Sequence, residues 1–231
     1  MNSYNLNDFS KDVLSSFAWG LLLTGGLGPR KKELLPYLDY VQFVVAADSG
    51  FDLALNLDLN PDFIVGDFDS IKNSHELKLF PKQKVKKFDQ DKDMTDTELG
   101  ISTLIKLGAN QLIVAGGGGG RFDHQLALLR LFETEKKLQV WLTESEVMTV
   151  IRDYSKFLGY ENSTISFFPL TDFVQINYST GLRWSLDGLR LERGQPSVSN
   201  VITDHVCQVS LKSGRLLMIR NLTNLEVPLT S

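Results

Sequence analysis

The sequence contains little cysteine and no long apolar segment. Its one cysteine, Cys207, has no partner within the chain, so we expect no intramolecular disulfide and a reducing compartment. The most apolar early run, residues 17–23, is too short to cross a bilayer. The first thirty residues also lack the basic stretch and apolar core of a secretory signal. We therefore expect a cytoplasmic protein that does not act in a membrane.

Basic residues are outnumbered, and histidines are few. The 24 Lys and Arg against 28 Asp and Glu give a net charge of −4 without any long basic block, which argues against nucleic acid as a partner. The 3 histidines have no metal-binding spacing, and no G-x-S-x-G elbow or Cys/His pair is present. Nucleophilic hydrolase mechanisms are thus disfavoured. A phosphorylated small molecule is still allowed, because it needs only a few local cations or a metal.

The first part of the chain, residues 1–145, has the pattern of an open α/β domain. Short runs that are apolar on both faces alternate with helical patterns, which is typical of a mostly parallel sheet covered by helices. We expect strands at residues 21–24, 43–47, 63–65, 112–115 and 140–142, and helices at residues 30–38, 51–57, 95–107 and 123–136.

The remaining part, residues 146–231, has a different pattern. Short β-branched and aromatic stretches at residues 164–168, 173–178, 206–211 and 216–220 are separated by turn signals such as Asp187-Gly188 and Ser213-Gly214. No amphipathic helix of useful length is visible. We expect an antiparallel β domain, small enough to need a partner surface.

Acidic residues follow several of the expected strands. Asp48 follows the second strand, and Asp67 and Asp69 follow the third. Asp96 belongs to a later group with Asp89, Asp91 and Asp93, which follows a further expected strand end at residues 85–88. Carboxyl ends of parallel strands meet at one edge of a sheet, so these carboxylates are expected to converge. Hard oxygen ligands without supporting His or Cys favour Mg²⁺. In extended chain, Asp67 and Asp69 point to the same side and can meet one ion. Any single aspartate here can instead begin a turn or cap a helix.

A run of five glycines, Gly116–Gly120, lies between an expected strand and a helix. Backbone N–H groups there can approach phosphate oxygens, and Arg121 beside it supplies a cation. The run matches neither a P-loop nor a dinucleotide fingerprint. His124 adjoins this segment, whereas a second cluster, residues 24–28, can either line a nucleotide pocket or only turn the chain. In the β part, composition alone favours a core position for Trp184, although a Trp near small polar residues can also stack on a flat ring.

The ordered set of motifs resembles the thiamine pyrophosphokinase family. It comprises Asp48-Ser49-Gly50, Gly66-Asp67-Phe68-Asp69-Ser70, Asp91-Lys92-Asp93-Met94-Thr95-Asp96, Gly119-Gly120-Arg121-Phe122-Asp123-His124, Thr180-Gly181-Leu182-Arg183-Trp184-Ser185-Leu186 and Ser197-Val198-Ser199-Asn200. The resemblance spans roughly residues 42–220. It implies an α/β catalytic domain followed by a β-sandwich thiamine-binding domain, and transfer of the pyrophosphoryl group of ATP to the hydroxyl of thiamine, giving thiamine diphosphate and AMP.

The resemblance also implies roles for individual residues. Asp48, Asp67, Asp69 and Asp96 would hold Mg²⁺ and orient the thiamine hydroxyl, with Asp69 or Asp96 as the base. Lys92, Thr95, Gly119, Gly120, Arg121 and Asp123 would belong to the nucleotide side. Trp184, Ser199 and Asn200 would lie at the thiamine ring. The family works as a homodimer with the active site between subunits, so these three residues would reach the neighbouring subunit's site.

Three other functions compete with this interpretation. A thiamine or nucleotide sensor would have the same pocket without turnover, but it has no need of several metal-competent acids. Another Mg²⁺-dependent kinase of a small alcohol would release ADP instead of AMP. A sugar-nucleotide transferase fits the Asp67-x-Asp69 pair but leaves the glycine–arginine segment and the β part unexplained.

Overall fold

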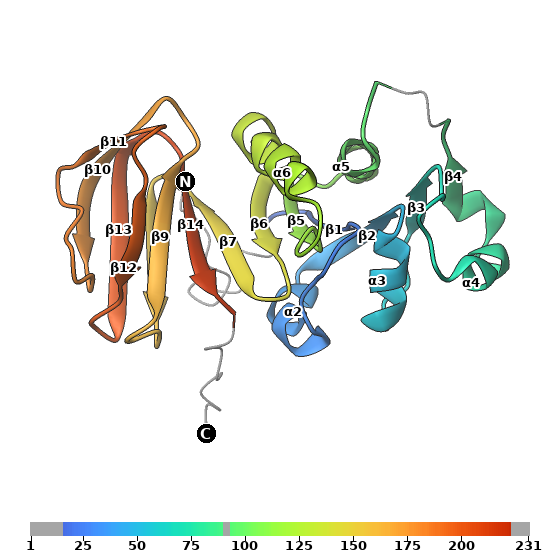
Figure 1. Ribbon diagram of the computed structural model, residues 1–231, viewed down its shortest axis with the longest axis horizontal. Helices are drawn as coiled ribbons and strands as arrows, with labels where there is room; N and C mark the ends of the chain where they lie inside the picture. Colours follow the sequence, from blue (N-terminus) through green and yellow to red (C-terminus); the bar gives the residue numbers. More distant parts are fainter. Residues whose placement is uncertain (1–15, 90–92, 223–231) are drawn as a thin grey trace. The chain divides into compact units, whose positions relative to one another are not determined.

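The computed structural model describes residues 16–89 and 93–222 of the 231-residue chain. The described residues divide into two compact units, one ending at Glu144 and the other beginning at Ser145. Figure 1 shows their helices and strands, and each unit is described by itself below. Within the described ranges, no helix combines the length and apolarity needed to cross a membrane.

The first unit is an open α/β sheet, as expected. Its six strands have the order β6-β5-β1-β2-β3-β4, and every neighbouring pair is parallel. Figure 1 shows α5 and α6 on one side of this sheet and α2 and α3 on the other. The strands are β1 (Trp19–Leu23), β2 (Val41–Ala47), β3 (Phe63–Gly66), β4 (Val85–Lys87), β5 (Gln111–Ala115) and β6 (Leu138–Leu142). The helices are α2 (Lys31–Leu38), α3 (Gly50–Asn56), α4 (Ser74–Leu79), the 3-10 turn η1 (Lys82–Lys84), α5 (Asp96–Leu107) and α6 (Phe122–Thr134).

Local sequence explains where these elements begin and end. All five residues of β1 are buried, because helices cover both faces of a central parallel strand. Thr95 is the N-cap of α5: its hydroxyl accepts the N–H of Glu98, whose carboxylate accepts the N–H of Thr95, completing a capping box. Gly108 ends the helix with a φ of 107°, a left-handed conformation that costs glycine little. The sequence pattern missed α4, which has no buried residue, whereas β4 falls within residues 85–88, where a strand was expected to end ahead of the acidic group.

The order of the strands fixes where a ligand can bind. From β1 the chain proceeds outward through β2, β3 and β4. Helix α5 then connects β4 back to β5, which lies on the other side of β1. The order therefore reverses between β1 and β5. In open α/β sheets, ligands bind outside the carboxyl ends of the strands at such a reversal, because the loops diverge there and leave a crevice.

The second unit consists of two antiparallel sheets. One has the order β12-β9-β14-β7 and the other β11-β10-β13-β8. Alternate residues of these strands point into a shared buried cluster that includes Phe157, Phe167, Ile176, Val209 and Met218. This is the packing of a β-sandwich. The strands are β7 (Glu146–Ile151), β8 (Tyr154–Leu158), β9 (Thr164–Pro169), β10 (Phe173–Thr180), β11 (Arg190–Glu192), β12 (Ser197–Val201), β13 (Val206–Ser213) and β14 (Leu216–Asn221).

Candidate functional site

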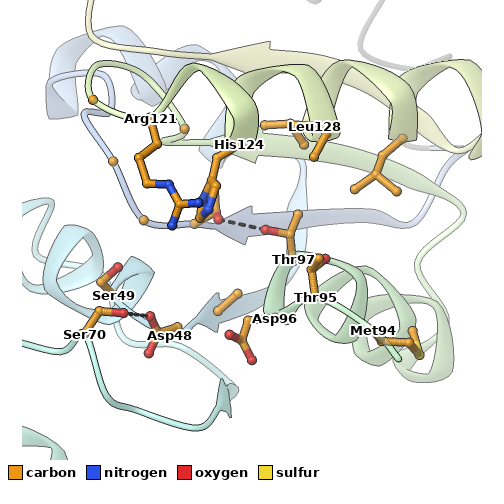
Figure 2. A pocket seen from close by; sticks show the side chains of 18 of the residues that line it. Asp48, Ser49, Ser70, Met94, Thr95, Asp96, Thr97, Arg121, His124 and Leu128 are labelled. Atoms are coloured by element: carbon orange, nitrogen blue, oxygen red, sulfur yellow. Dashed lines mark hydrogen bonds between the residues drawn. The ribbon is translucent and has the colours of Figure 1, made fainter. Parts of the chain in front are cut away.

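A cavity of about 640 Å³ opens at the carboxyl edge of the parallel sheet, at the reversal of strand order. Figure 2 shows side chains from loops and helices that are far apart in the sequence pointing into it. The cavity brings together predicted residues that lie up to 73 positions apart. Those that line it are Asp48, Asp67, Thr95, Asp96, Gly119, Gly120 and Arg121.

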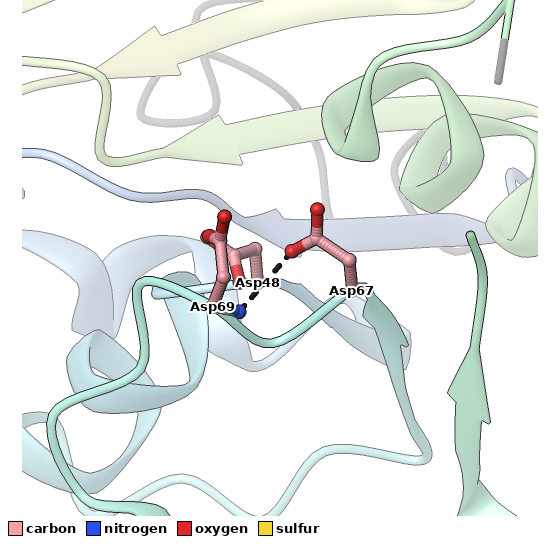
Figure 3. Close-up of side chains that lie close together, drawn as sticks. All are labelled: Asp48, Asp67 and Asp69. Atoms are coloured by element: carbon pink, nitrogen blue, oxygen red, sulfur yellow. Dashed lines mark hydrogen bonds between the residues drawn. The ribbon is translucent and has the colours of Figure 1, made fainter. Parts of the chain in front are cut away.

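Three aspartates converge beside this cavity. Asp48, Asp67 and Asp69 each offer a carboxylate oxygen, and these oxygens all lie within 4.8 Å of one another (Figure 3). The convergence does not come from an extended chain, as the i, i+2 spacing predicted. Phe68 between them is left-handed with a φ of 69°, and the N–H of Asp69 donates to Asp67 Oδ1 at 3.2 Å. A tight turn therefore aims both carboxylates at Asp48.

Asp48 is a half-buried member of the cluster. Burial raises its pKa, and the nearby charges of Asp96 and Asp67 raise it further, whereas hydrogen bonds from the Ser70 hydroxyl and the Ser49 N–H oppose the rise. Its Oδ1 is buried and has no hydrogen-bond partner among the described residues. A buried carboxylate oxygen without a donor is costly unless a cation meets it. The donor set therefore fits a hard divalent cation such as Mg²⁺.

Asp96, the first residue of α5, lies near Asp48 next to Gly66. A Cβ added to Gly66 would lie 3.2 Å from both Asp96 Oδ1 and Asp48 Cβ, and its φ of 145° disfavours any other residue. Glycine at the end of β3 thus lets the two carboxylates approach (Figure 2). All four aspartates predicted from the sequence to bind metal are gathered at one place.

Two glycine loops form one wall of the cavity. The segment after β1 and the run after β5 are paired: the N–H of Gly117 donates to Gly25 O at 2.8 Å, and Leu27 and Gly118 exchange N–H···O bonds of 2.6 and 2.9 Å. A Cβ on Gly116 would lie 2.2 Å from Thr24 O, so only glycine permits this approach. Thr24, Gly25 and Gly26 line the cavity, which favours the pocket-lining interpretation of residues 24–28.

Arg121 is the cation of this wall. It is the N-cap of α6, and its guanidinium donates through Nε and Nη2 to the two carboxylate oxygens of Asp123 at 3.2 and 2.5 Å. These hydrogen bonds raise the pKa of Arg121 and lower that of Asp123. Asp123 is not among the residues that line the cavity, but it hydrogen-bonds Arg121, which does line it. Lys92, also predicted for this side, lies outside the described residues.

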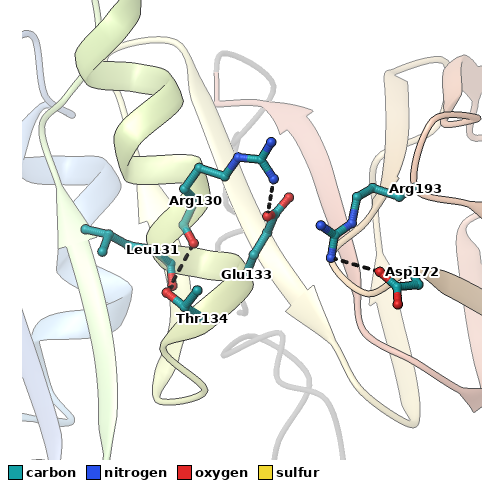
Figure 4. A network of polar contacts seen from close by, with 6 residues as sticks. All are labelled: Arg130, Leu131, Glu133, Thr134, Asp172 and Arg193. Carbon is teal, nitrogen blue, oxygen red and sulfur yellow. Dashed lines mark hydrogen bonds and ion pairs between the residues drawn. The ribbon is translucent and has the colours of Figure 1, made fainter.

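One face of α6 completes the cavity. Of the residues on this face, only His124 was singled out from the sequence. His124, Ala127, Leu128 and Leu131 line it. Their spacing of three to four residues marks a single helical stripe, which was the available signal. Elsewhere on the same helix, the exposed Arg130 donates through Nη1 to Oε2 of the largely buried Glu133 at 2.5 Å (Figure 4). Other lining residues that were not predicted as site residues are Ser49, Ser70, Asp93, Met94, Thr97 and Gly117.

The predicted ring-binding residues lie together in the second unit. Trp184 is 56% exposed, so the core position favoured by composition was wrong. Asn200 is buried, and its side chain bonds the Trp184 backbone twice, accepting its N–H at 3.2 Å and donating to its carbonyl at 2.7 Å. Ser199 is left-handed with a φ of 59°, and its N–H donates to Ser166 Oγ at 3.0 Å. Trp184 is therefore exposed on a backbone that Asn200 holds, with the guanidinium carbon of Arg183 5.6 Å from the centroid of its ring.

An open α/β sheet with clustered carboxylates opposite a glycine loop and an arginine is the arrangement expected of a transferase acting on phosphate groups. The sequence model described as "Thiamin pyrophosphokinase, catalytic domain" matches residues 34–142. A second one, "Thiamin pyrophosphokinase, vitamin B1 binding domain", matches residues 149–216. The chain therefore belongs to the thiamin pyrophosphokinase family.

Individual relatives agree with this membership. The chain is 23% identical to thiamine pyrophosphokinase of Bacillus subtilis over 209 residues, which is 87% of this chain and 97% of the relative. It is 30% identical to thiamin pyrophosphokinase 1 of Caenorhabditis elegans over 172 residues, which is 68% of each chain. The crystal structure of thiamin pyrophosphokinase from Geobacillus thermodenitrificans matches with a TM-score of 0.68 and 25% identity, covering 88% of this chain and 97% of that one.

Proposed function

We propose that this chain transfers the pyrophosphoryl group of ATP to the hydroxyl of thiamine. The thiamine oxygen forms a bond to the β-phosphorus of ATP, the bond from that phosphorus to the bridging oxygen of AMP breaks, and the hydroxyl proton is released. The observation that carries the proposal is the convergence of three carboxylates beside a cavity walled by glycine loops and Arg121. This group of carboxylates lies in the unit that matches the model of the family's catalytic domain.

We propose Mg²⁺ as the cation, held by Asp48, Asp67, Asp69 and Asp96. The buried Asp48 Oδ1 without a partner among the described residues supports this assignment. When bound, the ion would neutralise charge on the phosphate oxygens, which is the main requirement of phosphoryl transfer. A chain with a net charge of −4 can bind ATP in this way because the metal supplies positive charge.

The chain's own residues would position the reactants and move the proton. Asp69 or Asp96 would accept the thiamine hydroxyl proton. Arg121, whose Nε and Nη2 donate to Asp123, would hold a phosphate group with its remaining N–H groups. The backbone N–H groups of Gly119 and Gly120 would contact phosphate oxygens. The Thr95 hydroxyl donates to the Glu98 carboxylate at 2.8 Å. Thr95 would therefore fix the start of α5, next to Asp96. Lys92 is proposed for the nucleotide side on resemblance alone.

The second unit is proposed to bind the thiamine ring. An exposed tryptophan offers a stacking face for a flat, cationic ring. Trp184 has that exposure, while Ser199 and Asn200 lie beside it. Following the resemblance, we propose a homodimer in which these residues serve the neighbouring subunit, with domains at residues 1–145 and 146–231. The expected cytoplasmic location stays a prediction.

A product assay tests the function directly. Purified chain is incubated with ATP, thiamine and Mg²⁺, and nucleotides and thiamine esters are separated by chromatography. The proposal requires AMP and thiamine diphosphate in equal amounts. ADP with thiamine monophosphate would instead identify a γ-phosphoryl kinase. Binding of both substrates without any product would identify a sensor.

A further inference from the structure

Asp52 has a set of hydrogen bonds that none of the roles above explains. It lies on α3, four residues after Asp48, and its carboxylate accepts three bonds from the segment that follows Asp69. Its Oδ2 accepts the N–H of Lys72 at 2.9 Å, and its Oδ1 accepts the N–H and the side-chain Nδ2 of Asn73 at 2.9 and 2.8 Å. A carboxylate that is saturated in this way fixes the backbone that donates to it.

These bonds hold one end of the loop that carries two of the clustered aspartates. The loop, residues 67–73, leaves β3 at Gly66 and is attached to the neighbouring segment, residues 48–52, at two points. Ser70 donates its hydroxyl to Asp48, and Asp52 accepts from Lys72 and Asn73. The chain before these attachments turns through the left-handed Phe68. A bulky residue in that conformation persists only when its surroundings hold it.

We propose that Asp52 is a positioning residue of the divalent-cation site. By fixing residues 72–73 onto α3, it keeps Asp67 and Asp69 within 4.8 Å of Asp48. This inference rests on the metal site of the proposed function. Asp52 does not belong to the carboxylate cluster and is not among the residues that line the cavity. Its effect on the cation is therefore exerted through the loop.

The substitution Asp52→Asn tests the geometry with little change in shape. Asn offers one carbonyl oxygen and one NH₂ group, so it cannot accept from Lys72 and Asn73 on both sides as the carboxylate does. Whichever way the amide points, a donor faces a donor at one of the two contacts. Asp58→Asn is the matched control. It also removes one negative charge just after α3, but Asp58 is 93% exposed and, within the described part of the chain, its carboxylate pairs with Lys31.

The measurement is a titration of the full chain with Mn²⁺ alone, without nucleotide or thiamine. We expect Asp52→Asn to raise the Kd for Mn²⁺ by roughly 10–100-fold, the usual cost of losing an outer-shell partner, and Asp58→Asn to leave it unchanged. In turnover assays, Asp52→Asn should raise the apparent KM for Mg²⁺ and recover most of kcat at saturating metal. A wild-type Kd in a folded Asp52→Asn variant overturns the inference, even if its melting temperature falls.

A second variant keeps the test decisive if Asp52→Asn does not fold. Asn73→Ala removes one of the three bonds and leaves both backbone donors in place. It should weaken Mn²⁺ binding by a smaller factor, and an unchanged Kd would overturn the inference. Failure of the wild-type chain to bind Mn²⁺ would refute the metal site itself, and with it the inference. The other refuting result is different: if wild type binds Mn²⁺ and the variant binds it equally well, only the inference about Asp52 fails.

Discussion

Asp67→Asn should stabilise the metal-free protein while abolishing its activity. The substitution removes a negative charge but keeps a carbonyl oxygen that can accept the N–H of Asp69, so the turn through Phe68 is retained. What it relieves is repulsion among the three carboxylates of the cluster. A residue that only began a turn would show neither the gain in stability nor the loss of activity.

The size of the effect follows from the geometry. For two unit charges 4.8 Å apart, Coulomb's law gives roughly 0.9–3.5 kcal/mol at effective dielectric constants of 80 to 20. Asp67 is half-buried and Asp69 is exposed, so solvent screening favours the lower end of that range. Removing the two pairs that involve Asp67 should therefore raise the free energy of unfolding by about 2 kcal/mol. This corresponds to a rise in Tm of roughly 4–8 °C for a chain of this size.

Adding Mg²⁺ should reverse the order of stability. At about 100 times Kd, a ligand that binds only the native state stabilises it by ~2.7 kcal/mol. Wild type should gain this, whereas Asp67→Asn should gain little, so the two melting curves should cross as metal is added. Thermal unfolding monitored by circular dichroism gives the Tm of each variant in EDTA and in Mg²⁺. Asp58→Asn serves as the control for charge removal. A variant that melts with or below wild type in EDTA, or responds equally to Mg²⁺, would refute the reasoning.

Three further predictions concern other parts of the site. Trp184→Ala should raise the KM for thiamine at least about tenfold and leave the KM for ATP unchanged, as measured by steady-state kinetics; equal effects on both would contradict a ring-stacking role. Arg121→Lys should raise the KM for ATP because a single ammonium group cannot bind both oxygens of Asp123 and a phosphate group in the fixed geometry of a guanidinium, and an unchanged KM would remove Arg121 from the phosphate wall. Mn²⁺ affinity should fall on acidification from a higher pH than an ordinary aspartate would set, because burial raises the pKa of Asp48 and its protonated form cannot hold a cation. In metal-free protein the sign is opposite: a raised folded pKa contributes stability at low pH that is lost as pH rises through it. Affinity that is constant across the acidic range would refute this assignment.

The fold was largely predictable because its signals are local. Runs that are apolar on both faces marked the central strands, and Thr95 with Glu98 and Gly108 marked the ends of α5. The strands that were not predicted include β8, β11 and β12, which lie at the edges of their sheets and bury few of their residues, so they leave little hydrophobic period in the sequence. β7 was also not predicted, although five of its six residues are buried. Pairing with a neighbouring strand, which sequence spacing does not encode, fixes them.

The candidate site likewise has features that could be predicted from the sequence and features that could not. That Asp48, Asp67 and Asp96 would meet follows from strand ends sharing one edge, which is a property of topology. The way in which Asp67 and Asp69 meet does not follow, because it depends on a left-handed Phe68. Likewise, the exposure of Trp184 depends on Asn200, sixteen residues away, which holds its backbone. Sequence patterns identify which residues carry the chemistry, whereas tertiary hydrogen bonds decide where those residues point.

Backbone strain at the acidic edge argues that convergence of the carboxylates is the purpose of this local structure. Asp48 and Phe68 are both left-handed, with φ of 47° and 69°, and conformations of this kind cost of order 1–3 kcal/mol each. Glycine at Phe68 would relieve the cost if the loop only had to turn. Burial of Asp48 and repulsion among the aspartates add further cost in the metal-free state. A bound cation would offset both the repulsion among the carboxylates and the cost of leaving Asp48 Oδ1 without a partner. The hydrogen bonds that Asp52 accepts from Lys72 and Asn73 hold the strained loop in the conformation that such a cation requires.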